Sequence, residues 1–256
     1  MNKKSLSIII PAYNEEGNIR PTCEGMAALA QKYLEDYEIL VFDDCSPDRT
    51  SEVVKDLQCV NPHIVLIRNE VNKGLGYNYR AGILKARCAY TIMVPGDNEV
   101  IADSLTEVFQ SLGSTDIIVC SSTNAHVRPF MRQLISRIFT FLVNAMFGLK
   151  VNYYNGPAII RTDLAKENLP STNSFAYMAV LLVYVLKLGA TYTYSTFSLR
   201  PRKYGKTKAF EFKNVVTVIS DILRLFWDVN ILGVCRGRRL KAPVGENALD
   251  GREVSH

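Results

Sequence analysis

The sequence lacks the features that mark disulfide-rich, zinc-binding and membrane-spanning proteins. Its six cysteines are scattered, without a Cys-x-x-Cys pair or zinc-like spacing, so we expect reduced thiols in a cytosolic protein. The longest nearly uncharged apolar segment, residues 175–186, is shorter than the roughly 20 residues that cross a bilayer. The N-terminus also lacks the apolar region and cleavage site of a signal peptide. These absences predict a soluble or peripheral protein.

The composition is that of a folded chain. Of 256 residues, 48% are hydrophobic and 21% are charged, which is enough apolar material for a substantial core. The net charge of +5 is modest, and basic residues concentrate late, in residues 200–208 and 236–241. This charge suits anionic partners such as phosphates or a lipid surface, and we expect no nucleic acid partner.

Short apolar runs alternate with helical segments through the first half of the chain. The runs that read as buried strands are residues 6–10, 38–42, 64–67, 89–93 and 116–120. Asn14 is expected to cap the first helix, and Ser46 followed by Pro47 to begin the second. Strands alternating with helices predict an α/β fold, with a mostly parallel central sheet flanked by helices on both faces.

Polar groups follow three of these strands. Asp43 and Asp44 come after the second, a Lys-Gly-x-Gly turn at residues 73–76 after the third, and Asp97 and Glu99 after the fourth. Parallel strands bring such ends to one edge of a sheet, where open α/β sheets bind ligands. Each acid alone is also explained by a helix cap or polar turn, and the glycine turn matches neither the P-loop nor the dinucleotide pattern. Together they favour a nucleotide pocket, and Asp97 with Glu99 could share one Mg²⁺ or Mn²⁺ ion with substrate phosphates.

Five motifs occur in order along the chain. They are Ile-Ile-Pro-Ala-Tyr-Asn-Glu at residues 9–15, Phe-Asp-Asp-Cys-Ser-Pro-Asp-Arg-Thr at 42–50, Asn-Lys-Gly-Leu-Gly at 72–76, Gly-Asp at 96–97 and Arg-Lys-Tyr-Gly-Lys-Thr-Lys at 202–208. With these motifs the chain resembles, over about residues 6–208, the family 2 glycosyltransferases with the GT-A fold, and most closely their dolichyl-phosphate mannose synthase-like branch of polyprenyl-phosphate sugar synthases. This resemblance implies a Rossmann-like GT-A domain over residues 1–228, with a nucleotide-sugar half at about 1–121, an acceptor half at about 122–228 and a basic, disordered tail at 229–256.

The resemblance also implies which residues bind the donor. The residues that would hold the base, ribose and diphosphate of a nucleotide-sugar are Pro11, Ala12, Tyr13, Glu15, Asp43, Asp44, Lys73, Gly74 and Asp97. The metal motif departs from the family's Asp-x-Asp, because Pro95 stands at the first aspartate. Asp97 is therefore the expected metal ligand, with Glu99 as a second candidate.

Residues 128–149 are expected to form a helix in which arginines lie among large apolar residues. One explanation is a core helix with exposed arginines. The other is an interfacial helix on a membrane surface, with its arginines toward phosphate. Related enzymes use arginines here against the lipid phosphate, so the resemblance favours the second explanation and assigns Arg128, Arg132 and Arg137 to the acceptor phosphate.

No Asp or Glu occurs between Glu167 and Glu211, where many family 2 enzymes that glycosylate a hydroxyl place their general base. A hydroxyl needs a base, whereas a phosphate monoester is already an anionic nucleophile near pH 7. The missing acid therefore favours a lipid phosphate acceptor. Arg202 and Lys208, in a basic loop expected to close over the diphosphate, are assigned a catalytic role with Asp97, since they would offset charge on the leaving nucleotide.

The sequence thus predicts a metal-dependent, inverting hexosyltransferase that moves sugar from GDP-mannose or UDP-glucose to a dolichyl or undecaprenyl phosphate. We expect it at the cytoplasmic face of a membrane, as a peripheral protein that can also form oligomers. A family 2 enzyme acting on a saccharide or glycolipid hydroxyl is one alternative, and a non-catalytic nucleotide-sugar-binding protein is another. The amphipathic segment 212–227 is open to packing, dimerisation or lipid contact.

Overall fold

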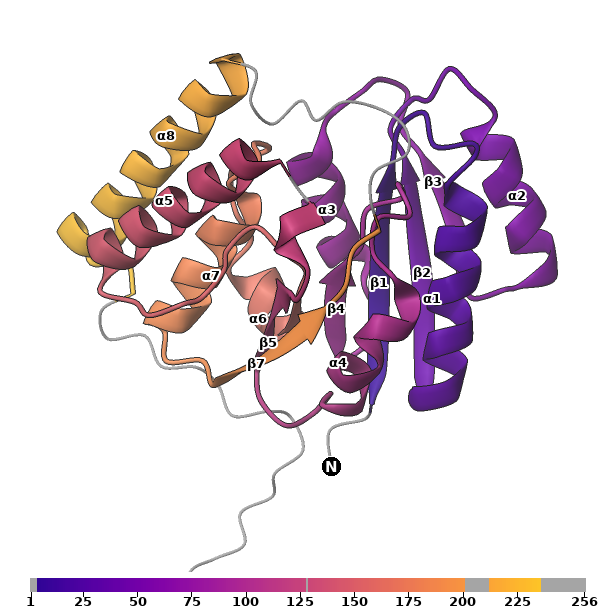
Figure 1. Cartoon of the computed structure of the whole chain (residues 1–256), viewed down its shortest axis with the longest axis horizontal. Coiled ribbons are helices and arrows are strands. Elements are labelled where there is room, and N and C mark those ends of the chain that lie inside the picture. Colours follow the sequence, from indigo (N-terminus) through magenta and orange to yellow (C-terminus); the bar gives the residue numbers. More distant parts are fainter. Residues whose placement is uncertain (1–3, 128, 201–211, 236–256) are drawn as a thin grey trace, which may run out of the picture.

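The structure, a computed structural model, describes residues 4–127, 129–200 and 212–235. Its centre is a seven-stranded sheet with the order β3-β2-β1-β4-β6-β5-β7 (Figure 1). The strands are β1 Ser5–Ala12, β2 Asp36–Asp43, β3 Ile64–Arg68, β4 Tyr90–Met93, β5 Ile117–Ser122, β6 Ala158–Arg161 and β7 Tyr192–Phe197. The first four strands run parallel, and so do β5 and β7. The predicted mostly parallel α/β sheet is confirmed.

The strand β6 was not predicted from the sequence, and it is antiparallel to both of its neighbours, β4 and β5. It has only three apolar residues before Arg161, a run too short to stand out in the sequence as a strand. Arg161 fixes its end: the guanidinium is nearly buried and contacts Asp116 at 2.8 Å and Asp163 at 2.5 Å. Two carboxylates therefore neutralise the buried charge where β6 enters the sheet.

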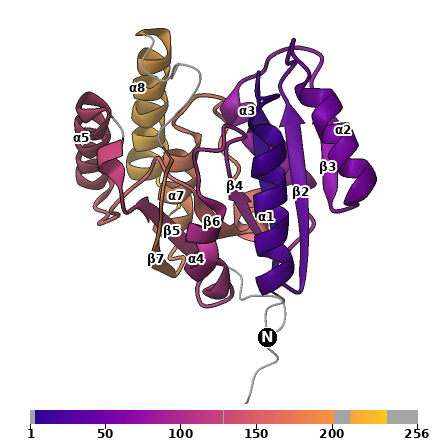
Figure 2. The same cartoon turned by 45° about the vertical axis from the view of Figure 1, so that its right-hand side comes forward.

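Helices cover both faces of the sheet (Figure 2). On one face lie α1 Ile19–Tyr33, α2 Thr50–Val60, the 3₁₀ turn η1 Ala102–Leu105 and α4 Thr106–Gln110. On the other lie α3 Leu75–Lys85, α5 Phe130–Phe147, α6 Thr162–Glu167, α7 Tyr177–Lys187 and α8 Phe212–Phe226. Successive side chains of β1 point to opposite faces of the sheet and so contribute to both cores: Ile8 and Ile10 pack with the first set of helices and Ile9 packs with the second.

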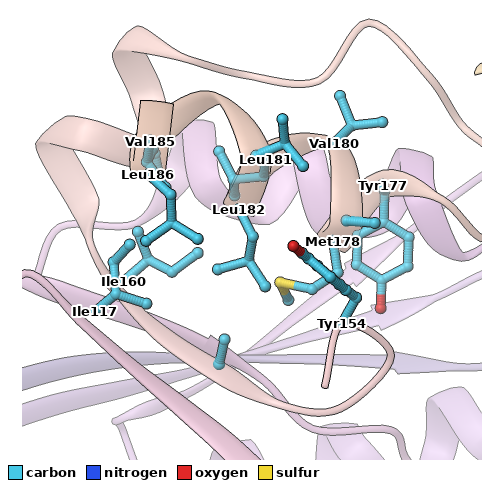
Figure 3. Packing of buried hydrophobic residues seen from close by; sticks show 14 of the residues in the cluster. Ile117, Tyr154, Ile160, Tyr177, Met178, Val180, Leu181, Leu182, Val185 and Leu186 are labelled. Atoms are coloured by element: carbon cyan, nitrogen blue, oxygen red, sulfur yellow. The ribbon is translucent and has the colours of Figure 1, made fainter. Parts of the chain in front are cut away.

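The helix α7 is the central helix of the second core. Nine of its eleven residues are buried, and Leu182 and Leu186 lie toward Ile117 and Ile160 of the sheet (Figure 3). Such a helix is apolar on all sides because protein surrounds it. Among the described residues, no helix is long and apolar enough to cross a membrane.

The first two helices begin later than predicted. α1 starts at Ile19 rather than after Asn14, which has a positive φ of 59°. α2 starts at Thr50 rather than at Pro47, and the side chain of Asp48 accepts the Thr50 amide at 3.1 Å. The polar residues ahead of both helices are used in contacts between the two loops instead of in helix caps.

The helix α5 is not a core helix. Of its 18 residues only Val143 and Phe147 are buried. It packs on α8, partly through the rings of Phe147 and Phe226, whose centroids are 6.2 Å apart. We use the name apolar face for the exposed apolar side chains of these two helices and of Trp227, which directly follows α8; they are Phe130, Met131, Leu134, Ile135, Ile138, Phe141, Leu142, Val215, Val216, Ile219, Leu223 and Trp227.

Candidate functional site

The carboxyl ends of β1, β2 and β4 meet at one edge of the sheet, as the sequence predicted. Ala12 pairs with Asp43 in the β1–β2 register, and the Asp44 amide donates to the Ala12 carbonyl at 2.9 Å. On the other side of β1, the Gly96 amide donates to the Pro11 carbonyl at 3.0 Å. The first acidic pair and the Asp97 loop therefore flank the Pro-Ala-Tyr turn.

The loop after β1 is braced by side chains of the loop after β2. The backbone amides of residues 14–16 donate to three side chains: Ser46 Oγ at 3.1 Å, Thr50 Oγ1 at 2.9 Å and Asp48 Oδ2 at 3.1 Å. Although partial burial opposes it, hydrogen bonds from Thr50 and the Glu16 amide hold the pKa of Asp48 below its usual value. The two loops form one rigid unit.

Two predicted donor residues are carried on this unit. Tyr13 is 39% exposed. Glu15 is partly exposed, and its Oε2 accepts a hydrogen bond from Asn18 at 2.8 Å. Tyr13 and Glu15 therefore lie at the carboxyl end of β1 and are accessible to solvent, so a planar base or a ribose could contact them.

Asp43 is fully buried, and its carboxylate is engaged within the chain. Its Oδ1 accepts the Ser46 amide at 2.9 Å, its Oδ2 accepts the Ser51 hydroxyl, and Arg68 Nε lies 3.6 Å from Oδ2. In this arrangement Asp43 shapes the β2 loop. Direct contact with the nucleotide remains a prediction for it.

Asp44 holds the Lys-Gly turn, residues 73–76. Its carboxylate accepts three hydrogen bonds of 2.8 Å, from Asn69 Nδ2, the Lys73 amide and the Gly74 amide. The first two amides of the turn therefore point to a carboxylate and not to a phosphate. The Lys73 ammonium is exposed and donates to Tyr77 Oη at 3.2 Å.

The other side of the Lys-Gly turn is closed by a segment distant in sequence. At Gly76, a Cβ would lie 2.6 Å from the carbonyl carbon and oxygen of Asn173 and 2.8 Å from the carbonyl oxygen of Ser174. Only glycine lets the backbones come so close. Nothing in the sequence indicated this contact, because it joins two loops almost 100 positions apart.

The loop after β4 presents Asp97 and Glu99, both partly exposed. Asp97 Oδ1 accepts the Glu99 amide at 3.1 Å, and Asn98 between them has a positive φ of 55°. Arg200 makes two hydrogen bonds to this loop: its amide donates to the Glu99 carbonyl at 2.7 Å and its Nη1 donates to Asn98 Oδ1 at 2.7 Å. This turn holds the two carboxylates at the sheet edge.

A metal ion would have few protein ligands here. Among the described residues, no group of three or more His, Cys, Asp or Glu side chains could hold a metal. Two carboxylates suit Mg²⁺ or Mn²⁺ when substrate phosphates and water complete the shell. The residues therefore fit a metal that binds together with a diphosphate.

Arg200 was not among the predicted site residues. It borders a cleft of about 180 Å³ beside the Asp97 loop, which is also lined by Pro21, Thr22, Gly25, Met26, Asn98, Val100, Ala102 and Asp103. In the sequence, Arg200 stood out only as the start of a basic stretch. Its contact with Asn98 depends on the bridge between Val100 and Leu199, which no local pattern encodes.

Two of the three predicted acceptor arginines, Arg132 and Arg137, lie on α5. Arg132 is partly exposed and Arg137 is exposed. They are five positions apart, so they project about 140° apart around the helix and are not a ready pair for one phosphate. Arg128, Arg202 and Lys208 lie outside the described residues, as do the sequence from 236 onward and most of the basic loop.

Known proteins share both the sequence pattern and the fold. The model of glycosyl transferase family 2 matches residues 7–168. A dolichyl-phosphate beta-glucosyltransferase of Trichomonas vaginalis is 29% identical over 117 residues, covering 44% of this chain and 35% of the relative. One from Dictyostelium discoideum is 28% identical over 159 residues, covering 55% and 49%. The chain thus spans about a third to a half of the length of these relatives.

Solved structures agree on the fold. Glucosyl-3-phosphoglycerate synthase of Mycobacterium tuberculosis, in complex with Mn²⁺, UDP and glucosyl-3-phosphoglycerate, superposes with a TM-score of 0.63 at 15% identity, covering 86% of this chain and 79% of that one. TarS of S. aureus with UDP-GlcNAc gives a TM-score of 0.60 at 19% identity, covering 88% and 67%. These neighbours have the GT-A fold that the sequence resemblance implied. With the family match over more than half of its length, the chain belongs to glycosyl transferase family 2.

Proposed function

We propose that the protein transfers a hexose from a nucleotide-sugar to a polyprenyl phosphate, with inversion at the anomeric carbon. The observation that carries this proposal is the absence of acids from residues 168–210. This stretch includes α7, whose side chains are nearly all buried and apolar, such as Met178 at 2% exposure, and none of them is an acid. Because this stretch supplies no general base, it favours an acceptor that is already an anionic nucleophile, as a phosphate monoester is.

The reaction then needs no proton transfer from the acceptor. An oxygen of the lipid phosphate attacks the anomeric carbon from the side opposite the leaving group. The new carbon–oxygen bond forms as the bond to the nucleoside diphosphate breaks, and the bonding pair leaves with the diphosphate. The protein's contribution is to position the two substrates and to offset the charge on the leaving group.

The donor is assigned to the sheet edge. Tyr13 and Glu15 are proposed to contact the base and ribose, with Asp43 and Asp44 shaping the pocket or contacting the nucleotide. Asp97, with Glu99, is proposed to hold Mg²⁺ or Mn²⁺, which would offset diphosphate charge when bound. Arg202 and Lys208 are proposed to act on the same charge. A glucosyl donor is the first to test, because the relatives are named as glucosyltransferases.

The lipid acceptor is assigned to the acceptor half. The apolar face, whose side chains include Phe130 at 72% and Phe141 at 71% exposure, suits the headgroup region of a bilayer. Arg132, Arg137 and Arg128 are proposed to attract the lipid phosphate. Peripheral contact with the cytoplasmic face of a membrane follows from this proposal.

The test uses purified protein with Mn²⁺, labelled UDP-glucose or GDP-mannose, and dolichyl or undecaprenyl phosphate in detergent. We expect label in a butanol-extractable, acid-labile lipid, and loss of that product with Asp97→Ala. Label moving instead to the hydroxyl of a saccharide or glycolipid would contradict the acceptor assignment. Donor binding without transfer or hydrolysis would indicate a non-catalytic nucleotide-sugar-binding protein.

A further inference from the structure

Asp221 lies on α8 and turns away from the apolar face. Its Oδ2 accepts hydrogen bonds from the hydroxyls of Thr172 and Ser174, which precede α7. Its neighbours Ile219 and Leu223 are exposed at 55% and 58%, so the helix presents apolar side chains outward while this carboxylate points to the protein. The contact joins α8 to the 171–176 segment.

Both hydroxyls also organise the 171–176 segment. Thr172 Oγ1 accepts the Ser174 amide at 2.9 Å, and Ser174 Oγ accepts the Ala176 amide at 3.0 Å at the start of α7. A hydroxyl that accepts from the backbone can still donate its own proton. Asp221 accepts the protons of both hydroxyls. Its carboxylate therefore orients Thr172 and Ser174, which in turn accept the backbone amides of Ser174 and Ala176.

The same segment forms one wall of the Lys-Gly turn. Asn173 and Ser174 are the residues whose backbone atoms leave no room for a Cβ at Gly76. On its other side, the turn is fixed by the bonds from the Lys73 and Gly74 amides to Asp44. The turn is therefore held between one carboxylate that contacts it directly and a second that acts through residues 172–174.

We infer that Asp221 is a positioning residue for the donor site: by fixing the 171–176 segment against Gly76, it links α8 to the turn that we assign to the nucleotide-sugar. This inference rests on the proposed function for the role of the turn. The link itself depends only on the contacts above. Its consequence is that donor binding depends on a residue of α8 that does not touch the donor.

The first measurement is hydrogen–deuterium exchange on the full chain without ligand. In Asp221→Ala we expect peptides covering residues 73–79 and 171–177 to exchange about ten-fold faster, because two hydrogen bonds to a charged acceptor are lost. The matched control is Asp228→Ala, which removes a carboxylate from the same helical stretch. The carboxylate of Asp228 accepts the Tyr184 hydroxyl at 3.3 Å and no hydrogen bond from residues 171–176, so this change should leave both peptides unaltered.

The second measurement changes the two hydrogen-bond donors instead of the acceptor Asp221. Thr172→Val with Ser174→Ala removes the two donors and should reproduce the exchange pattern. Adding Asp221→Ala to this pair should produce little further change, since the three side chains act through the same bonds. Asp221→Asn keeps an acceptor oxygen, so its exchange rates at both peptides should lie between those of wild type and Asp221→Ala. This variant also allows the inference to be tested if Asp221→Ala does not fold.

The third measurement is the Kd for UDP-glucose and GDP-mannose with Mn²⁺, by calorimetry well below the unfolding temperature. Asp221→Ala should weaken the binding that wild type shows by about ten-fold, with Asp221→Asn intermediate and Asp228→Ala unchanged. Unaltered exchange at residues 73–79 in Asp221→Ala, or an unaltered Kd, would overturn the inference. Failure of wild type to bind any donor would contradict the proposed function, and the exchange result would still decide the link.

Discussion

Removing the charge of Asp44 should destabilise the protein and weaken the donor site together. The carboxylate is 4% exposed and accepts three hydrogen bonds of 2.8 Å. In Asp44→Asn, the better orientation of the amide keeps the oxygen at the position of Oδ1, which takes two of these bonds. The new NH₂ group then faces the Gly74 amide, donor against donor.

The magnitude follows from these contacts. One lost hydrogen bond to a charged acceptor costs about 1.5–3 kcal/mol, so Asp44→Asn should lower the free energy of unfolding by roughly that amount. Asp44→Ala leaves three donors without their acceptor and should cost about 4 kcal/mol or more. Both variants should also weaken nucleotide binding, because the Lys-Gly turn loses one of its two supports.

The assay is urea unfolding followed by circular dichroism, together with calorimetric donor binding. Gly17→Ala is a suitable control, because a Cβ at Gly17 meets nothing within 4 Å. An Asp44→Asn protein with wild-type stability would refute the reasoning, since it would mean that the hydrogen bond from the Gly74 amide contributes nothing. A stable variant with weakened binding would show instead that Asp44 contacts the nucleotide directly.

Three further predictions concern other parts of the molecule. Asp97→Ala should abolish transfer while changing the free energy of unfolding by less than about 1.5 kcal/mol, since Asp97 is partly exposed and the hydrogen bond that it accepts from the Glu99 amide joins two residues of the same turn; parallel activity and urea measurements check this. Phe141→Glu should reduce sedimentation with anionic vesicles without loss of stability, because its side chain is 71% exposed; unchanged sedimentation would remove the apolar face from the membrane contact. Although burial opposes it, hydrogen bonds from Thr191 and Arg161 hold the pKa of Asp116 below its usual value, and Arg161 does the same for Asp163. Both carboxylates therefore stabilise the fold at any pH above their unfolded pKa near 3.8, and this stabilisation is lost as the pH falls through their lower pKa values in the folded protein. Arg161→Met should weaken this effect, so the free energy of unfolding should depend less on pH between about pH 5 and 2.

The sequence was sufficient for the parts of the fold that have a local signature. Strand ends and their order placed Asp43, Asp44 and Asp97 at one sheet edge, because consecutive parallel strands must end on the same side. It missed β6, whose four residues carry no periodicity, and it began α1 and α2 too early. In those two cases the cap-like residues bind another loop, and tertiary contacts override the local preference.

The candidate site was predictable in outline only. Residue type indicated that Asp44 belongs there, but not that its oxygens hold the Lys73 and Gly74 amides. Arg200 stood out only as the start of a basic stretch, and nothing in the sequence singled out Asp221, because each acts through a partner far away in the sequence. The exposure of α5 was open from its composition. The packing of α7 between the sheet and α8 decides it, because α7 fills most of the core and leaves α5 to contribute only Val143 and Phe147 as buried residues.

The bracing between the first two loops has a consequence for which positions can change. Residues 14–16 contribute backbone amides to the three hydrogen bonds, and every amino acid except proline has one. Ser46, Asp48 and Thr50 contribute side-chain oxygens, which few residues can replace. Glu16 adds a side-chain oxygen that accepts the Arg49 amide at 3.0 Å, and Asn14, with its φ of 59°, has a backbone conformation that few side chains adopt. In a library of variants, substitutions at Ser46, Asp48 and Thr50 should therefore alter the shape of the first loop, although no residue of that loop has changed.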